Sequence, residues 1–405
     1  MKIKLLRRIV IKTLSILFIP FKNFIPKSNI VILGTSSRYR YKDNTRYLIE
    51  YLNLKGMENL YWVTDSREIE EHLDQLGIGY IGWKSPLKMI WISLRAKIVI
   101  DSGNKFFNPF DILNSNKTIK ITTMHGNGPK VAISRFHPPD NHKIGLQQIE
   151  NMYAFDYVNY PSPYSSSKVG KRVHLLPNKK IISLGYPRCD QYFDSYYVES
   201  RYKEKKIANS LCPLLKENSK IILYTPTWRP YSYEFPLTLM KDCDFKALDK
   251  WLQSKNVFLF FSIHSAVKPA NIPVSLKHII NIDSDLPFYD TNEFMLEVDV
   301  LLNDYSTTST DFAILNRPQL FFMPDYDYYY EDCGFVEDYK QLLPGKEVRS
   351  QDELIKGLEY IFSQKDNYLD SHKDKKKELL EKYYDINQRN SSENFHSFIT
   401  EVLDT

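Results

Sequence analysis

The sequence predicts an α/β protein with two parallel β-sheets, each wound by helices. Short apolar runs rich in Val, Ile, Phe and Tyr alternate with amphipathic helical patterns along most of the chain, which is typical of βαβ units and a parallel sheet. A polar, helix-prone stretch from Asp194 to Lys220 interrupts the alternation and forms a natural bridge between two domains. At 405 residues with 43% apolar content, the chain can bury one large or two medium-sized cores, and its length favours two domains.

The first alternation begins at Asn29 and ends near Pro187. Its strand-like runs are NIVILG, NLYWVTD, IGYIGW, KIVIDS, TIKITTMHG, DYVNYPS and KIISLGYP, with helical patterns such as NTRYLIEYL and SREIEEHLDQLG between the early ones. The second alternation contains IILYTPTW, VFLFFSIHS, HIINID, VDVLLNDYS and PQLFFMP. We expect a first domain over residues 29–205, a second domain over residues 206–375, and a C-terminal helix, residues 376–405, that packs back on the first domain.

The first 28 residues are basic and apolar at once. Ten Lys or Arg precede the first acidic residue, Asp43, although the whole chain carries a net charge of only +5. The uncharged run from Thr13 to Phe21 is shorter than the roughly 20 residues that cross a bilayer, and Pro20 would end a helix there. We therefore predict an interfacial amphipathic helix that contacts a membrane surface. A buried first helix and a signal peptide are the alternatives, the latter without a small-residue cleavage site.

The composition excludes several classes of protein. A basic head on a nearly neutral body argues against a nucleic-acid enzyme, whose positive charge should cover its binding face. The four cysteines are far apart and lack metal-type spacing, so we expect neither a metal site nor a disulfide framework.

The first candidate site follows the strand-like run that ends near Thr122. In the segment TMHGNGPK, His125 stands where a parallel strand opens toward a cleft, and two glycines let the backbone approach a ligand. Imidazole titrates near neutral pH, so His125 is suited to take the proton of an alcohol during phosphoryl transfer, and Lys130 is suited to meet phosphate charge. The alternative is a histidine that caps or fills a glycine-rich turn.

Hydroxyl side chains crowd the second candidate site, Asn303–Thr310, between VDVLL and the helical pattern DFAILN. The free N–H groups and the dipole of a helix start bind anions. Ser306, Thr307 and Thr308 would add donors, so a diphosphate could be held there without a metal. The alternative is an ordinary helix N-cap.

Three further motifs stand at predicted strand ends. Arg229 in YTPTWR is suited to bidentate phosphate contacts. His264 ends the apolar run VFLFF and is either a ligand contact or a core histidine. In GYPRCD we expect a fixed turn in which Arg188 pairs with Asp190 as a structural clasp.

Taken in order, these motifs resemble the CDP-glycerol glycerophosphotransferase family of teichoic acid and capsule synthesis, from about Asn29 to Val348. TMHGNGPK is similar to W-H-G-T-P-L-K, GYPRCD to G-Y-P-R-N-D, YTPTWR to Y-A-P-T-W-R, and KDNTRYL to D-N-S-K-Y-L. LLNDYSTTSTDFAILNRPQLFF is similar to the D-Y-S-S motif with its following helix and strand. DYYYEDCGF and PGKEV resemble Y-x-x-x-R-G-F and P-G-P, with Cys333 in place of the arginine.

The resemblance implies two Rossmann-like domains in a GT-B arrangement and no cofactor. It implies that His125 is the general base and that His264 is a second catalytic histidine near the donor phosphates. Ser262 and Ser265 replace the residues that the family has around that histidine, and Asn127 and Gly128 also depart from its pattern. Together with the residue patterns, the resemblance gives the expected donor-binding set: Lys130, Arg229, Asp304, Ser306, Thr307 and Thr308.

We therefore expect transfer of glycerol phosphate from CDP-glycerol to a hydroxyl of a lipid-linked wall teichoic acid or capsule acceptor. The resemblance implies attack on the β-phosphate with release of CMP, by a peripheral enzyme at the cytoplasmic face of the bacterial cell membrane. Transfer of ribitol phosphate from CDP-ribitol is the main alternative. A GT-B nucleotide-sugar glycosyltransferase, and a membrane-docked partner that has lost its chemistry, are the others.

Overall fold

The computed structural model describes residues 16, 20–103, 113–126, 128–130, 150–227, 229, 243–263, 275–282, 286–385 and 389–405. His264 and most of the predicted N-terminal helix lie outside these residues. The interfacial character of that helix therefore stays a prediction.

Seven parallel strands form the first sheet, in the order β3-β2-β1-β4-β5-β6-β7. They are β1 (Ser28–Gly34), β2 (Leu60–Val63), β3 (Gly79–Ile81), β4 (Ala96–Asp101), β5 (Ile119–Thr122), β6 (Tyr157–Asn159) and β7 (Ile181–Ile182). The helices between the first four strands are α2 (Asp43–Leu54), α3 (Arg67–Leu76) and α4 (Pro86–Arg95). Because the strand order reverses between β1 and β4, a crevice is expected at the carboxyl ends of these strands.

The second sheet repeats this plan with six parallel strands in the order β10-β9-β8-β11-β12-β13. Its strands are β8 (Lys220–Tyr224), β9 (Val257–Ser262), β10 (Ile279–Ile282), β11 (Val300–Asn303), β12 (Gln319–Phe322) and β13 (Lys346–Val348). Its helices include α9 (Phe245–Ser254), α10 (Thr291–Phe294), α11 (Thr308–Ala313) and α12 (Tyr326–Asp332). The prediction of an α/β fold with two parallel sheets is confirmed.

Burial on both faces explains the nearly continuous apolar runs of the central strands. In β1, Val31 and Leu33 pack into a core cluster with α2 and α3, while Ile30 and Ile32 pack on the opposite face with α4. A strand covered by helices on both faces has no solvent side that would require alternating polar residues.

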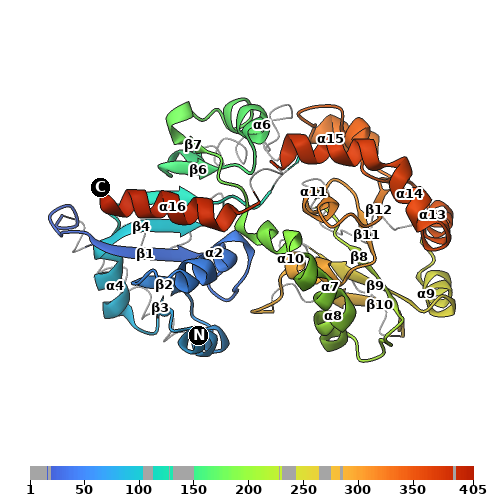
Figure 1. Ribbon diagram of the computed structural model, residues 1–405, viewed down its shortest axis with the longest axis horizontal. Coiled ribbons are helices and arrows are strands. Elements are labelled where there is room, and N and C mark those ends of the chain that lie inside the picture. The colour runs from blue at the N-terminus through green and yellow to red at the C-terminus, as the bar shows by residue number, and fades with distance from the viewer. Residues whose placement is uncertain are drawn as a thin grey trace.

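The polar bridge between the sheets is helical. It contains α7 (Ser195–Glu204) and α8 (Lys206–Leu211), and the short 3₁₀ turn Pro187–Phe193 precedes it. Apolar side chains from both sheets and from the bridge form one contiguous core cluster, which includes Val158, Tyr192 and Leu223. The two lobes in Figure 1 are therefore joined by packed side chains as well as by the chain.

The C-terminal helices serve both lobes. α13 (Gln351–Ser363), α14 (Lys365–Ser371) and α15 (Lys373–Tyr383) lie along the lobe of the second sheet, and α16 (Ser391–Asp404) lies on the lobe of the first (Figure 1). Phe395, Ile399 and Val402 of α16 join the core cluster of β1 and α2. The segment predicted as a single helix over 376–405 is thus divided between α15 and α16.

The run KIISLGYP is mostly not a strand, because its end is shaped by a contact with α16. Gly185 has a φ of +83°, and a Cβ there would lie 2.2 Å from Ser391 Oγ. Only glycine combines this backbone conformation with so close an approach. The two-residue strand β7 ends before this turn.

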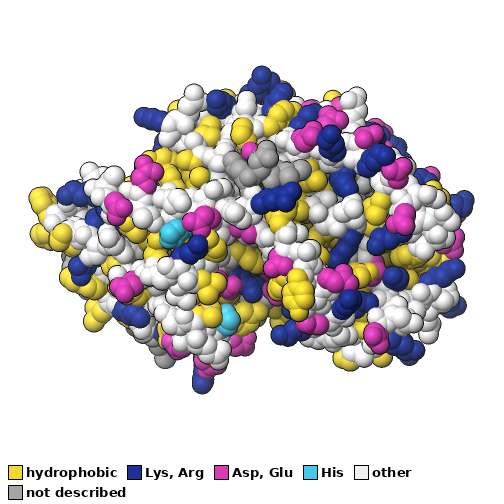
Figure 2. All heavy atoms as spheres, in the orientation of Figure 1, with side chains coloured by type: hydrophobic (Ala, Val, Ile, Leu, Met, Phe, Trp, Pro, Cys, Tyr) yellow, Lys and Arg dark blue, Asp and Glu magenta, His cyan; other side chains and the backbone are white. Residues whose placement is uncertain are grey.

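Figure 2 shows one face of the molecule, on which basic and acidic side chains are interspersed over both lobes. No pair of the four cysteines, all of which belong to the described residues, forms a disulfide.

Candidate active site

His125 lies just beyond β5, in a turn that holds its ring in one orientation. The side chain is exposed, and Nδ1 lies 3.0 Å from the carbonyl oxygen of Ser102, at the end of β4. Because a carbonyl only accepts hydrogen bonds, Nδ1 carries the proton in this contact, and the neutral ring then has its lone pair on Nε2. This is the tautomer that a general base needs.

The backbone of this turn is strained and externally supported. Met124, directly before His125, has a φ of +55°, which is unfavourable for a residue with a side chain. Asn44 Nδ2 donates to the Met124 carbonyl at 2.8 Å, and the Tyr186 hydroxyl donates to the Gly126 carbonyl at 2.9 Å. The motifs KDNTRYL and GYPRCD thus support the histidine turn, which is why three separated motifs form one site.

Ser306, Thr307 and Thr308 lie at the carboxyl end of β11 in the second lobe and are partly exposed. The Oγ of Ser306 is 2.9 Å from Thr308 Oγ1, and Asn303 Nδ2 donates to the Ser306 carbonyl at 2.8 Å. The three hydroxyl residues therefore form an ordered, accessible group at the start of α11.

The histidine turn of the first lobe meets the hydroxyl-bearing segment Ser306–Thr308 of the second lobe. A Cβ on Gly128 would lie 3.4 Å from both Thr307 Cγ2 and Thr310 Oγ1, and one on Gly126 would lie 3.7 Å from Thr307 Oγ1. The two glycines thus let the turn approach α11, and the structure brings the predicted base and the predicted anion site together.

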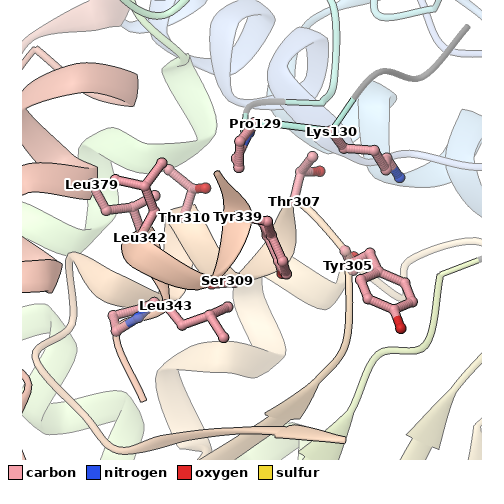
Figure 3. A pocket seen from close by; sticks show the side chains of 12 residues that line it. Pro129, Lys130, Tyr305, Thr307, Ser309, Thr310, Tyr339, Leu342, Leu343 and Leu379 are labelled. Atoms are coloured by element: carbon pink, nitrogen blue, oxygen red, sulfur yellow. The ribbon is translucent and has the colours of Figure 1, made fainter. Parts of the chain in front are cut away.

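A small pocket lies where the two lobes meet (Figure 3). Pro129 from the first lobe lies opposite Thr307 and Thr310 from the second, whereas the Lys130 side chain extends away from these two threonines. The complete lining is Pro129, Lys130, Tyr305, Ser306, Thr307, Ser309, Thr310, Tyr339, Leu342, Leu343, Pro344 and Leu379.

Lys130 is held by its backbone to the second lobe. It forms an antiparallel bridge with Phe335, and Val336 N donates to the Pro129 carbonyl at 2.7 Å. Burial lowers the pKa of the Lys130 ammonium, while the Asp304 carboxylate opposes that shift. A polyanionic ligand nearby would favour the charged ammonium further.

Arg229 and Asp304 are fully buried and paired with each other. Asp304 also accepts hydrogen bonds from the backbone N–H groups of Thr227, Tyr305 and Ser306. In this arrangement the carboxylate joins the end of β8 to the loop after β11.

The Arg229 guanidinium makes a second, bidentate pair. Its Nε and Nη2 each lie 3.0 Å from an oxygen of Asp325, which follows β12. The carbon atom of the guanidinium also lies 4.8 Å from the centre of the Tyr305 ring. Burial alone would lower the pKa of Arg229, but Asp304 and Asp325 outweigh it and keep the side chain charged. Direct donor contacts by Arg229 and Asp304 stay a prediction, and their observed contacts order the loop instead.

Arg188 is buried in ion pairs, but its partners differ from the predicted one. Its guanidinium pairs with Asp43 and Asp311 at 2.7 and 2.8 Å. Asp190 instead accepts hydrogen bonds from the backbone N–H groups of Ser391 and Ser392, at the start of α16. The predicted pairing of Arg188 with Asp190 is wrong because each side chain turns toward a different, sequence-distant helix.

Several residues that shape the site were not predicted, among them Asn44, Ser102, Tyr186, Asp311 and Asp325. Asn44 and Tyr186 belong to motifs that the sequence singles out without a role. Asp325 follows a strand end, which was an available signal. Nothing local marks Ser102, which acts through its carbonyl, or Asp311, which lies 123 residues from Arg188.

Within the described ranges, no helix combines the length and apolar character that crossing a membrane requires. In the same part of the chain, no group of three or more His, Cys, Asp or Glu side chains is arranged to hold a metal ion.

A family model described as CDP-Glycerol:Poly(glycerophosphate) glycerophosphotransferase matches residues 17–401. A teichoic acid glycerol-phosphate transferase of Staphylococcus aureus is 28% identical over 365 residues, which cover 86% of this chain and 87% of that protein. A teichoic acid poly(ribitol-phosphate) polymerase of Bacillus spizizenii is 27% identical, covering 85% of this chain and 53% of that protein. The solved structure of the wall teichoic acid polymerase TagF has the same fold, with a TM-score of 0.72, 20% identity, and coverage of 93% of this chain and 90% of that one.

Proposed function

Because the chain belongs to the CDP-glycerol:poly(glycerophosphate) glycerophosphotransferase family, we propose that it transfers glycerol phosphate from CDP-glycerol to a hydroxyl of a lipid-linked wall teichoic acid or capsule acceptor. The observation that carries this proposal is the meeting of the His125 turn with the Ser306–Thr310 segment, at Gly128. One side supplies a base for an alcohol and the other supplies hydroxyl donors for a diphosphate.

In the proposed reaction, Nε2 of His125 removes the proton of the acceptor hydroxyl as its oxygen attacks the β-phosphorus of CDP-glycerol. A new oxygen–phosphorus bond forms, and the bond from the β-phosphorus to the bridging oxygen breaks. CMP leaves with that electron pair, and the imidazolium retains the acceptor's proton. The Ser102 carbonyl stabilises the protonated ring through Nδ1.

We assign the donor diphosphate to Ser306, Thr307, Thr308 and Lys130. The three hydroxyl side chains are partly exposed, and Lys130 lines the pocket between the lobes together with Ser306 and Thr307. Arg229 and Asp304 would act on the donor by fixing this loop, since both are fully buried. His264, in the proposed mechanism, offsets charge that develops on the donor phosphates.

We further propose that residues 1–28 hold the protein at the cytoplasmic face of the cell membrane, where a lipid-linked acceptor is available. The support is the basic and apolar sequence of this segment. Two aromatic side chains at its end, Phe21 and Phe24, are 60% and 83% exposed. Exposed aromatic groups beside lysines are suited to the headgroup region of an anionic bilayer.

Replacement of the base provides the first test. With CDP-glycerol and a lipid-linked acceptor, we expect His125→Ala to slow CMP release by about 10²–10⁴-fold, the usual contribution of a general base. His372→Ala is a matched control, because His372 lies between α14 and α15, where its ring contacts Ser371 and Tyr368. Normal CMP release by a folded His125→Ala variant, with both CDP-glycerol and CDP-ribitol, would exclude this mechanism.

Ribitol phosphate is the second candidate for the transferred group, because a poly(ribitol-phosphate) polymerase is among the relatives. Competition between CDP-glycerol and CDP-ribitol on one acceptor, with the product analysed for its alditol, distinguishes the two. Consumption of a UDP or GDP sugar with no use of either CDP-alditol would instead favour a glycosyltransferase.

A further inference from the structure

The Arg188 side chain connects both lobes to the histidine turn. Its Nη1 donates to Asp43 Oδ1 at 2.7 Å, and its Nη2 donates to Asp311 Oδ2 at 2.8 Å. The same Nη2 donates to the backbone carbonyl of His125 at 2.8 Å. One guanidinium therefore contacts the start of α2, the turn that carries the base, and α11 of the second lobe.

This contact links the two halves of the site. Asp311 lies on α11. The start of this helix carries the hydroxyl side chains that are proposed to bind the diphosphate. A guanidinium is a rigid, planar fork, so its bonds fix the relative positions of the groups that accept them. With 4% of its side chain exposed, Arg188 is also shielded from water that would compete for these bonds.

Two residues of the first lobe next to the Arg188 contacts have strained backbone, which suggests that these contacts serve the site. Asp43 has a φ of +65° and Met124 a φ of +55°. Asp43 accepts a hydrogen bond from Arg188, and Met124 directly precedes the residue whose carbonyl Arg188 holds. Left-handed backbone at residues with side chains persists only where surrounding contacts impose it.

We propose that Arg188 is a positioning residue for the transfer reaction: it holds the His125 turn at a fixed place relative to the diphosphate-binding loop of the second lobe. This inference rests on the proposed function of His125 as the base. Because Arg188 is buried, its proposed effect on the reaction passes through its hydrogen bond to the backbone of His125.

The test replaces Arg188 with lysine, which keeps the charge and loses the fork. We expect kcat to fall about 10–100-fold, because a small misplacement of a catalytic group is enough for such a loss. The KM for the CDP-alditol should change by less than about threefold, because the donor site itself is intact. The melting temperature, measured in parallel, reports any general destabilisation.

Arg46→Lys is the matched control. Arg46 also joins the lobes, through a 2.8 Å pair with Glu293 on α10, and its other ion-pair partner is Glu50 of its own helix. We expect its kcat to stay within about twofold of the wild-type value. An equal loss of kcat in both variants would mean that Arg188 only holds the lobes together, and the proposal would be wrong.

A double-mutant cycle separates positioning from a purely structural role. In a His125→Ala background, Arg188→Lys should cause less than about a twofold further loss of the residual rate, because the group it positions is gone. Losses that multiply would overturn the proposal. If Arg188→Lys does not fold, Asp311→Asn provides the cycle, since it weakens the same link while retaining an acceptor oxygen.

The two proposals fail in different ways. If the wild-type enzyme consumes a nucleotide sugar and no CDP-alditol, the proposed function is wrong, and the same cycle can be measured with that donor. If CDP-alditol is used and the losses multiply, only the role of Arg188 is wrong.

Discussion

At the scale of single residues, buried charge in this protein serves to place backbone. Asp304 accepts the N–H groups of Tyr305 and Ser306, so its carboxylate shapes the loop that presents the hydroxyl side chains. Arg188 does the same for the carbonyl of His125. In both cases the charged side chain is buried, whereas the residue that it positions, Ser306 or His125, is at least partly exposed and could contact a substrate.

Asp304→Asn should therefore destabilise the fold as well as the site. The side-chain amide of Asn places N–H donors opposite the backbone N–H groups and the Arg229 guanidinium, which are donors too. The substitution also removes the fully buried carboxylate that neutralises Arg229. Breaking a buried pair of this kind costs about 3–5 kcal/mol, which urea denaturation measures. Asp325→Asn should cost less, because the Asp325 side chain is 17% exposed and Asp304 still neutralises Arg229. Equal losses would show that the burial of Asp304 is not what matters.

At the scale of elements, periodicity and strand-end motifs predict much of the architecture. Nearly all strands were expected, because a strand buried on both faces has a distinctive apolar run. The three-residue strand β13 was not, since Lys346 and Glu347 give it no such run. The predicted residues His125 and Ser306–Thr308 lie at carboxyl strand ends that face each other. The partners of Arg188 and Asp190 were not predictable, because they come from distant helices and leave no local pattern.

Asp190 offers a test of how α16 is attached. Its carboxylate accepts the N–H groups of Ser391 and Ser392, and so caps a helix that lies about two hundred residues away in sequence. Asp190→Ala should cost about 0.5–2 kcal/mol, as lost N-caps do, and should speed hydrogen exchange along α16.

Asp194→Ala is the control for Asp190→Ala, because the Asp194 side chain caps a different helix, α7, which follows it directly in the sequence. A similar loss of stability is expected there, without faster exchange in α16. Equal exchange of α16 in the two variants would contradict a specific role for Asp190 in docking this helix.

At the scale of the whole molecule, the proposed base, His125, and the hydroxyl side chains of Ser306–Thr308 belong to different lobes. The proposed site therefore exists only while the lobes keep their relative position. The shared core cluster and the Arg188 contacts both contribute to that position. The lobe of the first sheet also carries the segment proposed to meet the membrane. In this proposal, the first lobe carries both His125 and the membrane-contacting segment, so a lipid-linked acceptor would approach His125 from the side of the first lobe.

Membrane association should consequently depend on the apolar tip of the first lobe. Phe21 and Phe24 are exposed there, and Arg95 of the neighbouring helix α4 donates to Ser28, where β1 begins. Two aromatic side chains inserted at an interface contribute enough for Phe21→Ser with Phe24→Ser to weaken sedimentation with anionic phospholipid vesicles about tenfold or more. Higher salt should weaken binding further, because lysines near an anionic surface are screened.

Leu214→Ser, at a residue 57% exposed beside α8 in the second lobe, should leave binding unchanged. Equal weakening by Leu214→Ser, or unchanged binding by the double variant, would place the membrane contact elsewhere on the protein.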